Sequence, residues 1–175
     1  MKNTLVKKAG ALLALLTVAI FLQISAFGQK PEEKSSVLSN GLSIEGVWQN
    51  TITPVDCHTG TPFGYTIAGL LTYHADGTIA ETGGAPPGLS RSPGHGVWRR
   101  INSRNYEGSF AFLLFDPMGN FVGTEKIAQI IRLNQSGRAF TDEATFQLYD
   151  PAGNPVPGAN GCARAAATRF APGFE

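Results

Sequence analysis

Apolar and polar residues alternate along most of the chain after residue 44, in short runs separated by Gly, Pro, Asn and Asp. In the segment 138–149, for example, Phe140 and Phe146 alternate with Thr141 and Thr145. A period of two residues is typical of strands with one buried face, and this region shows no sustained helical period. The pattern predicts an all-β domain with strands at 45–55, 62–74, 77–83, 95–102, 105–115, 121–133, 138–149 and 161–170.

The segments between these strands carry residues that favour tight turns. "ADGT" (75–78) and "NQSGR" (134–138) supply a Gly where a hairpin needs a positive φ, and "DPMGN" (116–120) supplies a Pro that presets φ. Consecutive hairpins favour an eight-stranded antiparallel up-and-down barrel, with a two-sheet sandwich as the alternative. In such a barrel the first and last strands, 45–55 and 161–170, are antiparallel neighbours.

The first 28 residues differ in composition from the rest of the chain. Three lysines precede an apolar run at 11–22, and small residues follow it, as in a secretory signal peptide. The alternative is an uncleaved anchor, but the run is shorter than the roughly 20 residues that cross a bilayer. We therefore predict a signal peptide at 1–28, a flexible leader at 29–44 and one barrel domain at 45–172, in a secreted or periplasmic protein.

Charge and cysteine content narrow the classes of partner. The 14 Lys and Arg residues include three in the signal peptide, so 11 basic and 13 acidic residues remain after it. This balance lacks the basic footprint of a nucleic-acid-binding protein, and no nucleic-acid partner is expected. Cys57 and Cys162 are the two cysteines, and export favours a disulfide between them. That bond would join the end of the first strand to the beginning of the last.

The same geometry brings Trp48, in "GVW", to the end of the barrel where Arg169, in "ATRF", completes the last strand. A Gly-x-Trp on the first strand, with a basic side chain from the last strand over the indole, resembles the signature of the calycins. These include lipocalins, fatty-acid-binding proteins and avidins. The resemblance implies a calycin-like barrel with Trp48 and Arg169 as structural residues at its closed end. The chain also resembles small uncharacterised exported bacterial proteins in "GVWQNTITPVDC", "SPGHGVWRR" and "GCARAAATRF".

The longer connections fall at the end of the predicted barrel that holds the cysteines, so we interpret this end as the mouth. The segment 84–94, "GAPPGLSRSPG", is either a lid over the mouth or a solvated crossover. We expect ligand contacts around this end from His58 and His95, and from the aromatic residues Phe110 and Phe112 inside it.

Strand 121–133 carries two polar residues, Glu125 and Gln129, on the same face as Ile127. If this face points inward, they are polar anchors in an apolar cavity and contact the ligand; if it points outward, they face solvent. Other strand carboxylates, such as Glu81 and Glu143, are expected to face water.

The chemistry-bearing motifs are few. We expect no metal and no cofactor, because no Cys-x-x-Cys pair or histidine spacing favours one, and "GLSRS" (88–92) lacks the nucleophile elbow. The sequence favours a barrel that binds a small apolar or amphipathic, lipophilic ligand. The alternatives are a cyclase- or isomerase-like enzyme on a lipophilic substrate and a structural envelope protein with a filled barrel. Segments 62–74 and 105–115 are apolar on both faces, notably at Leu70 and Leu113, which predicts a homo-oligomer through their outer faces.

Overall fold

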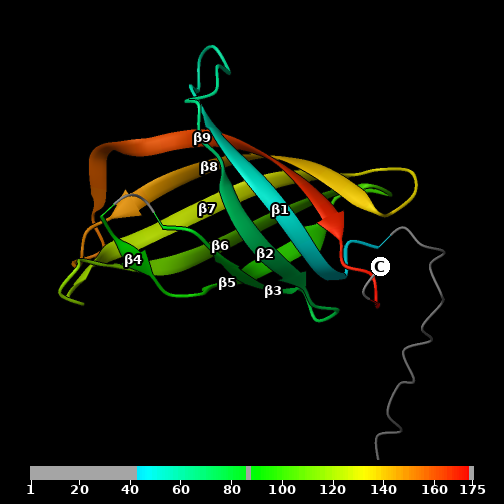
Figure 1. Cartoon of the computed structure of the whole chain (residues 1–175), viewed down its shortest axis with the longest axis horizontal. Coiled ribbons are helices and arrows are strands. Elements are labelled where there is room, and N and C mark those ends of the chain that lie inside the picture. Colours follow the sequence, from blue (N-terminus) through cyan, green and yellow to red (C-terminus); the bar gives the residue numbers. More distant parts are fainter. Residues whose placement is uncertain (1–42, 86–87, 174–175) are drawn as a thin grey trace, which may run out of the picture. The chain divides into compact units, whose positions relative to one another are not determined.

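The computed structural model of the chain describes residues 43–85 and 88–173, which form a closed antiparallel β-barrel without helices (Figure 1). Eight strands make the wall, and a two-residue strand, β4, is attached at its rim. The strands are β1 (Gly46–Val55), β2 (Ile67–Tyr73), β3 (Thr78–Gly83), β4 (Ser90–Arg91), β5 (Gly94–Arg100), β6 (Asn105–Phe115), β7 (Phe121–Leu133), β8 (Ala139–Tyr149) and β9 (Pro155–Arg169).

The barrel closes through its first and last strands. Neighbours pair in the order β1, β2, β3, β5, β6, β7, β8, β9, and β9 pairs again with β1. Trp48 lies opposite Arg169, and Val55 lies opposite Cys162. The disulfide between Cys57 and Cys162 follows directly, with Cα atoms 5.2 Å apart. The predicted eight-stranded barrel and its disulfide are confirmed, and the alternative sandwich is wrong.

Two connecting turns share the sequence Asp-Pro-x-Gly-Asn and the same geometry. In the turn between β6 and β7, the Asp116 carboxylate accepts a hydrogen bond from the backbone N–H of Asn120, and Gly119 has a φ of +84°. The turn at 150–154 repeats this arrangement. Because only glycine adopts this φ freely, the turn residues specify both hairpins.

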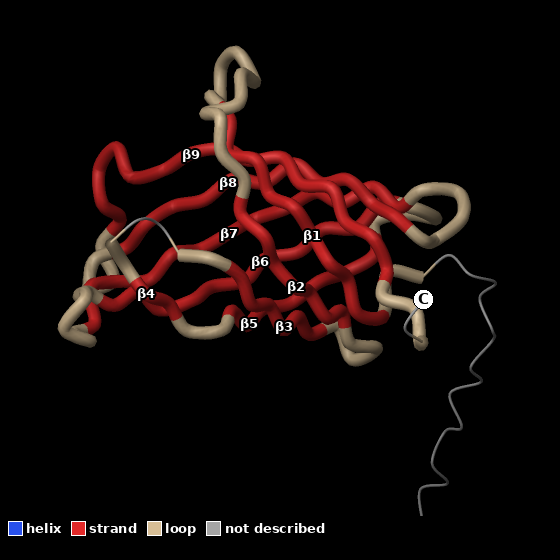
Figure 2. The backbone as a smooth tube through the Cα atoms, in the orientation of Figure 1, coloured by secondary structure: helices blue, strands red, loops and turns tan. Residues whose placement is uncertain are grey.

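The structure differs from the sequence-based strands in three places. β2 begins at Ile67 rather than 62, because residues 56–66 form a loop that leaves the wall and contains a positive φ at Gly64 (Figure 2). β9 begins at Pro155 rather than 161, because Pro155 pairs with Tyr149 at the end of β8. Among the described strands, the part of β9 before Cys162 pairs with β8 alone. β4 was not expected and pairs with the end of β6.

One end of the barrel is closed by aromatic side chains. The rings of Trp48 and Phe140 contact edge to face with centroids 4.9 Å apart, and those of Trp98 and Tyr106 do so at 5.7 Å. Trp48, Tyr73, Tyr106 and Phe140 are almost completely buried. Edge-to-face pairs add to the energy of burial, so this layer is both sealed and stable.

The predicted signal peptide at 1–28 and most of the predicted leader at 29–44 lie outside the described residues. The last two leader residues, Ser43 and Ile44, are described and contact the barrel. Ile44 is buried in the aromatic layer, and its carbonyl oxygen accepts a 2.8 Å hydrogen bond from Nε1 of Trp48. No described residue belongs to a helix long and apolar enough to cross a membrane.

Candidate functional site

The closed end is fastened by the pair that the sequence placed there, Trp48 and Arg169. The Arg169 guanidinium lies over the indole, 4.2 Å from the ring centroid, and donates hydrogen bonds to three backbone carbonyl groups. Gly46 has a φ of +125°, and a Cβ there would lie 2.7 Å from Nη1 of Arg169. The Gly-x-Trp motif therefore has a structural purpose, because it makes room for the arginine.

Strand register decides which residues of β7 face the interior. Glu125 pairs with Leu148, which packs against the interior cluster around Phe110. Gln129 is buried and donates a 2.8 Å hydrogen bond to the hydroxyl of Tyr73, which comes from β2. Side chains alternate along a strand, so Glu125 and Gln129 both lie on the inward face. Of the two orientations that the sequence left open, the structure has the inward one.

The interior changes character toward the end that holds β4. Phe110 and Phe112 face inward and pack with Leu114. Unlike the aromatic layer, several inward-facing apolar side chains in this half are only partly buried: Ile127, Ala144, Phe146, Leu148 and Ala163. Ala144 and Ala163 also border a groove on the outer surface through their backbone, so the exposure that points to the interior is that of Ile127, Phe146 and Leu148. The interior is therefore packed less completely toward this end than in the aromatic layer.

A buried ion pair lies at the edge of this half. Nη1 of Arg91, in β4, donates to Oε2 of Glu81, in β3, at 2.8 Å, and Nη2 donates to Oε1 at 2.6 Å. The guanidinium carbon lies 4.1 Å from the centroid of the Phe112 ring, and Nε donates to the carbonyl of Gly83. The expectation that Glu81 faces water is wrong, because the arginine neutralises it inside the barrel.

Two further inward-facing carboxyl groups form no ion pair with any described residue. Asp142, on β8, is 5% exposed, and burial raises its pKa from 3.8 to about 7, against one backbone hydrogen bond that lowers it. Burial also raises the pKa of Glu125, with Arg91 opposing the shift and Glu81 adding to it. Burial raises the pKa of Tyr73, and the Asp142 carboxylate adds to that shift. The interior therefore carries carboxyl groups that are shielded from solvent.

Glycines on the facing strands make room for the polar side chains. A Cβ at Gly94 would lie 2.8 Å from Oε2 of Glu81, and a Cβ at Gly69 would lie 2.5 Å from Oδ1 of Asn50. A Cβ at Gly108 would lie 2.9 Å from Nε2 of Gln129, its partner on the adjacent strand β7. Strand glycines weaken a sheet, so several of them on one wall indicate that space is needed there.

Asn50, on β1, is the most unusual polar residue of the interior. It is 4% exposed, and its Oδ1 is the buried side-chain atom that lacks a hydrogen-bond partner among the described residues. A buried acceptor left unpaired costs about 1–3 kcal/mol. Asn50 and Asp142 lie on the two sides of β9, whose inward-facing residues between them are Ala165 and Ala167.

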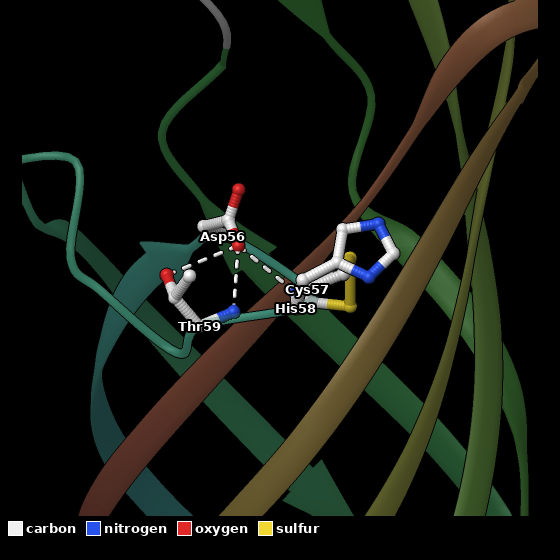
Figure 3. Close-up of a disulfide and its surroundings, with 5 residues drawn as sticks. Asp56, Cys57, His58 and Thr59 are labelled. Carbon is white, nitrogen blue, oxygen red and sulfur yellow. Dashed lines mark hydrogen bonds between the residues drawn. A yellow bond between two sulfur atoms is a disulfide. The ribbon is translucent and has the colours of Figure 1, made fainter.

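The two histidines predicted at the mouth do not line the interior. His95 is exposed on β5, where its two neighbours, both glycine, occupy the inward positions. His58 lies in the turn around the disulfide, where the Asp56 carboxylate accepts hydrogen bonds from the backbone N–H groups of His58 and Thr59 (Figure 3). These two backbone hydrogen bonds hold the pKa of Asp56 below its usual value, and the bond from Thr59 has the larger effect. The structure therefore separates both histidines from Phe110, Phe112, Glu125 and Gln129, which it brings together.

A groove of about 890 Å³ crosses the outer surface of β5 to β9. The exposed side chains of Val97 and Ile130 line it, and the disulfide and His58 lie at one end. Gln129 and Ala144 also line it, through their backbone, because their side chains point inward. Neither carboxyl group with a raised pKa lines this groove, so the groove offers no such group to a ligand.

No protein-family model matches the chain, and no curated protein is similar to it in sequence. Its architecture, an eight-stranded antiparallel closed barrel, is consistent with a calycin-like fold. Within residues 43–85 and 88–173, no three His, Cys, Asp or Glu side chains are grouped so that they would hold a metal ion. The class that fold and site define is a β-barrel compatible with the binding of a small molecule.

Sequence reasoning missed three polar residues of the interior: Asn50, Arg91 and Asp142. Asp142 had a usable signal, since it stands between Phe140 and Ala144 on the apolar face of its strand. Asn50 likewise stands two residues after the buried Trp48, on the same face of β1. Arg91 had no such signal, because its entry into the barrel depends on how Ser90 and Arg91 pair with β6.

Proposed function

We propose that the protein binds a small apolar or amphipathic molecule inside its barrel, entering through the end that holds β4. The observation that supports this most directly is the contrast between the two halves of the interior. The aromatic layer is largely buried, whereas the inward-facing Ile127, Phe146 and Leu148 are partly exposed. Ligand sites in barrels combine apolar walls with a few polar groups, and Gln129 and Asp142 lie below these apolar residues.

We also propose that the protein is exported, to the periplasm or outside the cell, as a lipocalin- or avidin-like carrier. The disulfide between Cys57 and Cys162 supports this location, because such bonds persist in oxidising compartments. The predicted signal peptide supports it independently.

A neutral fluorophore, N-phenyl-1-naphthylamine, tests the binding proposal. Its emission should increase in the presence of the wild type. Ala163→Trp fills the proposed cavity and should weaken the binding of the dye at least about tenfold, since the new ring occupies the ligand's place. Ala166→Trp is the matched control, because Ala166 is on the same strand but exposed on the outer face, and it should leave binding unchanged. No emission change with the wild type, or equal loss in both variants, would contradict the proposal.

Asp142 favours a second candidate function, an isomerase-like enzyme on a lipophilic substrate. A general acid–base group works best when its pKa is near the working pH, and burial raises the pKa of Asp142 to about 7. We expect the wild type in D₂O to accelerate deuterium incorporation next to the carbonyl of a long-chain ketone, as measured by mass spectrometry. Equal rates for the wild type and Asp142→Asn would rule out this function.

A further inference from the structure

Among the inward-facing ionisable groups of the half that holds β4, acidic groups outnumber basic ones. Three carboxyl groups, those of Glu81, Glu125 and Asp142, face a single guanidinium, that of Arg91, in the described part of this region. Arg91 directs Nη1 and Nη2 to the two oxygens of Glu81 and Nε to a backbone carbonyl. It therefore has little capacity for a second anion: burial raises the pKa of Glu125, and the Arg91 charge opposes that shift without forming an ion pair with Glu125. Asp142 forms no ion pair with any described residue.

An isolated carboxylate is unfavourable in such surroundings, so it either keeps its proton or meets a cation. The groups that face Asp142 do not supply that cation. They are Tyr73 from β2, whose raised pKa reflects burial and then the Asp142 charge, and the apolar residues Ile131 of β7 and Ala165 of β9. Any positive charge that stabilises ionised Asp142 must therefore come from a bound molecule.

Asn50 provides an independent observation at the same depth. Its buried Oδ1 has no donor among the described residues. The β9 residues that pair with Asn50 and Asp142 are Ala167 and Ala165, which carry short side chains. The interior thus presents two acceptors on the strands that flank β9, with Oδ1 of Asn50 lying over Gly69 of β2. A group with several N–H donors satisfies both, whereas a carboxylate satisfies neither.

We propose that the barrel selects an amphipathic cation, a molecule with an apolar chain and an amine that is protonated at neutral pH. This rests on the proposed function, since it concerns the polar end of a ligand inside the barrel. The ammonium group donates hydrogen bonds to Asp142 and to Oδ1 of Asn50. The chain extends along Ala144, Ala163 and Phe146 toward the mouth, where Glu125 adds to the negative potential. A fatty acid of the same length is disfavoured, because its head group repels these carboxylates.

Three ligands with the same chain separate the contributions of charge and apolar contact. Dodecylamine, dodecanol and dodecanoic acid are titrated against the wild type with N-phenyl-1-naphthylamine bound, at pH 8, about 150 mM salt and below their micelle concentrations. We expect dodecylamine to bind at least about tenfold more tightly than either of the others. Because an ammonium favours ionised Asp142, its affinity should also rise about tenfold from pH 6 to pH 8.

Two variants test whether the preference for the amine arises from Asp142 inside the barrel. Asp142→Asn should abolish both the advantage of the amine and its pH dependence, while Glu143→Gln, which changes the exposed outward-facing neighbour, should preserve both. Equal displacement by all three ligands, or tighter binding of the acid, would overturn the inference and leave the binding function intact. If the dye does not bind to the wild type, the proposed function is contradicted. Dodecylamine binding is then measured by calorimetry, and no detectable binding would contradict the inference as well.

Discussion

Asp142 makes the stability of the barrel depend on pH in a direction that is unusual for an aspartate. Its pKa is about 7 in the folded chain, against 3.8 for an ordinary aspartate. The folded state therefore holds this proton more tightly than the unfolded state does. The resulting stability is fully present below pH 4 and is lost as the pH rises through 7. Asp142→Asn keeps the shape of the side chain and removes its titration.

The magnitude follows from the two pKa values. A shift from 3.8 to about 7 corresponds to about 4 kcal/mol of unfolding free energy between the protonated and ionised limits. Between pH 5 and pH 8 the loss is about 2–3 kcal/mol, because the unfolded chain is already mostly ionised at pH 5. Tyr73 does not contribute in this window, since its pKa is raised well above 10.0. The raised pKa of Glu125 makes stability fall with pH in the same direction as that of Asp142. Because Glu125 is present in both the wild type and Asp142→Asn, its effect cancels in the comparison.

Urea unfolding at pH 5, 6, 7 and 8, followed by tryptophan fluorescence, measures the effect. We expect the unfolding free energy of the wild type to fall by about 2–3 kcal/mol relative to that of Asp142→Asn between pH 5 and pH 8. At pH 8 the variant should be the more stable protein. The control is Glu143→Gln, whose side chain is exposed on the outer face and which should follow the wild type at every pH.

Parallel pH dependences of the wild type and Asp142→Asn would refute this reasoning. They would mean that the carboxyl group is solvated in solution or that it finds a partner which keeps it ionised. Either result would also remove the basis for acid–base chemistry at this position. A variant that is less stable than the wild type at pH 8 would be equally damaging, because the neutral amide should relieve the cost of a buried charge.

Three further predictions concern the barrel itself. Replacing Cys57 and Cys162 by Ala should lower the unfolding free energy by about 3–5 kcal/mol in urea titrations, because the bond closes a loop with a sequence separation of 105 residues; a loss below about 1 kcal/mol would contradict this. Gly46→Ala should cost at least about 2 kcal/mol, since its Cβ would collide with the arginine over Trp48 at a positive φ, whereas Gly119→Ala, with open space around it, should cost only about 1 kcal/mol. The predicted self-association through the outer faces of β2 and β6 should disappear in Leu113→Glu, measured by sedimentation velocity, and a monomeric wild type would show that these faces have no such role.

Much of the fold was accessible from the sequence because the turns and the alternation specify it locally. The Asp-Pro-x-Gly-Asn turns fix where β6 and β8 end, and alternation fixes which residues of β8 face inward. The position of Trp48 against Arg169 followed from the even number of strands. The start of β9 did not, because "PVPGANG" has the composition of a loop and becomes a strand only beside the end of β8.

The site was less accessible, because its polar groups depend on partners far away in the chain. The alternation around Glu81 does not indicate that it is buried, since Arg91, in the connection that follows β3, reaches it only when β4 pairs with β6. His58 and His95 were expected to contact a ligand because the longer connections place them at the end that holds the cysteines. In the structure His95 lies on the outward face, and the loop of His58 leaves the wall.

The extension of β9 past β1 leaves a stretch of strand edge that another chain could extend by intermolecular pairing. Such an edge is a template for aggregation unless it is blocked. Pro155 and Pro157 have no N–H to offer, Gly158 turns the backbone with a φ of +74°, and the amide of Gln147 binds the carbonyl oxygen of Val156 at 3.1 Å. The wall of the mouth is thus lengthened by a segment that resists addition of a further strand. Pro157→Thr would restore a donor, and light scattering should then detect chains that assemble edge to edge.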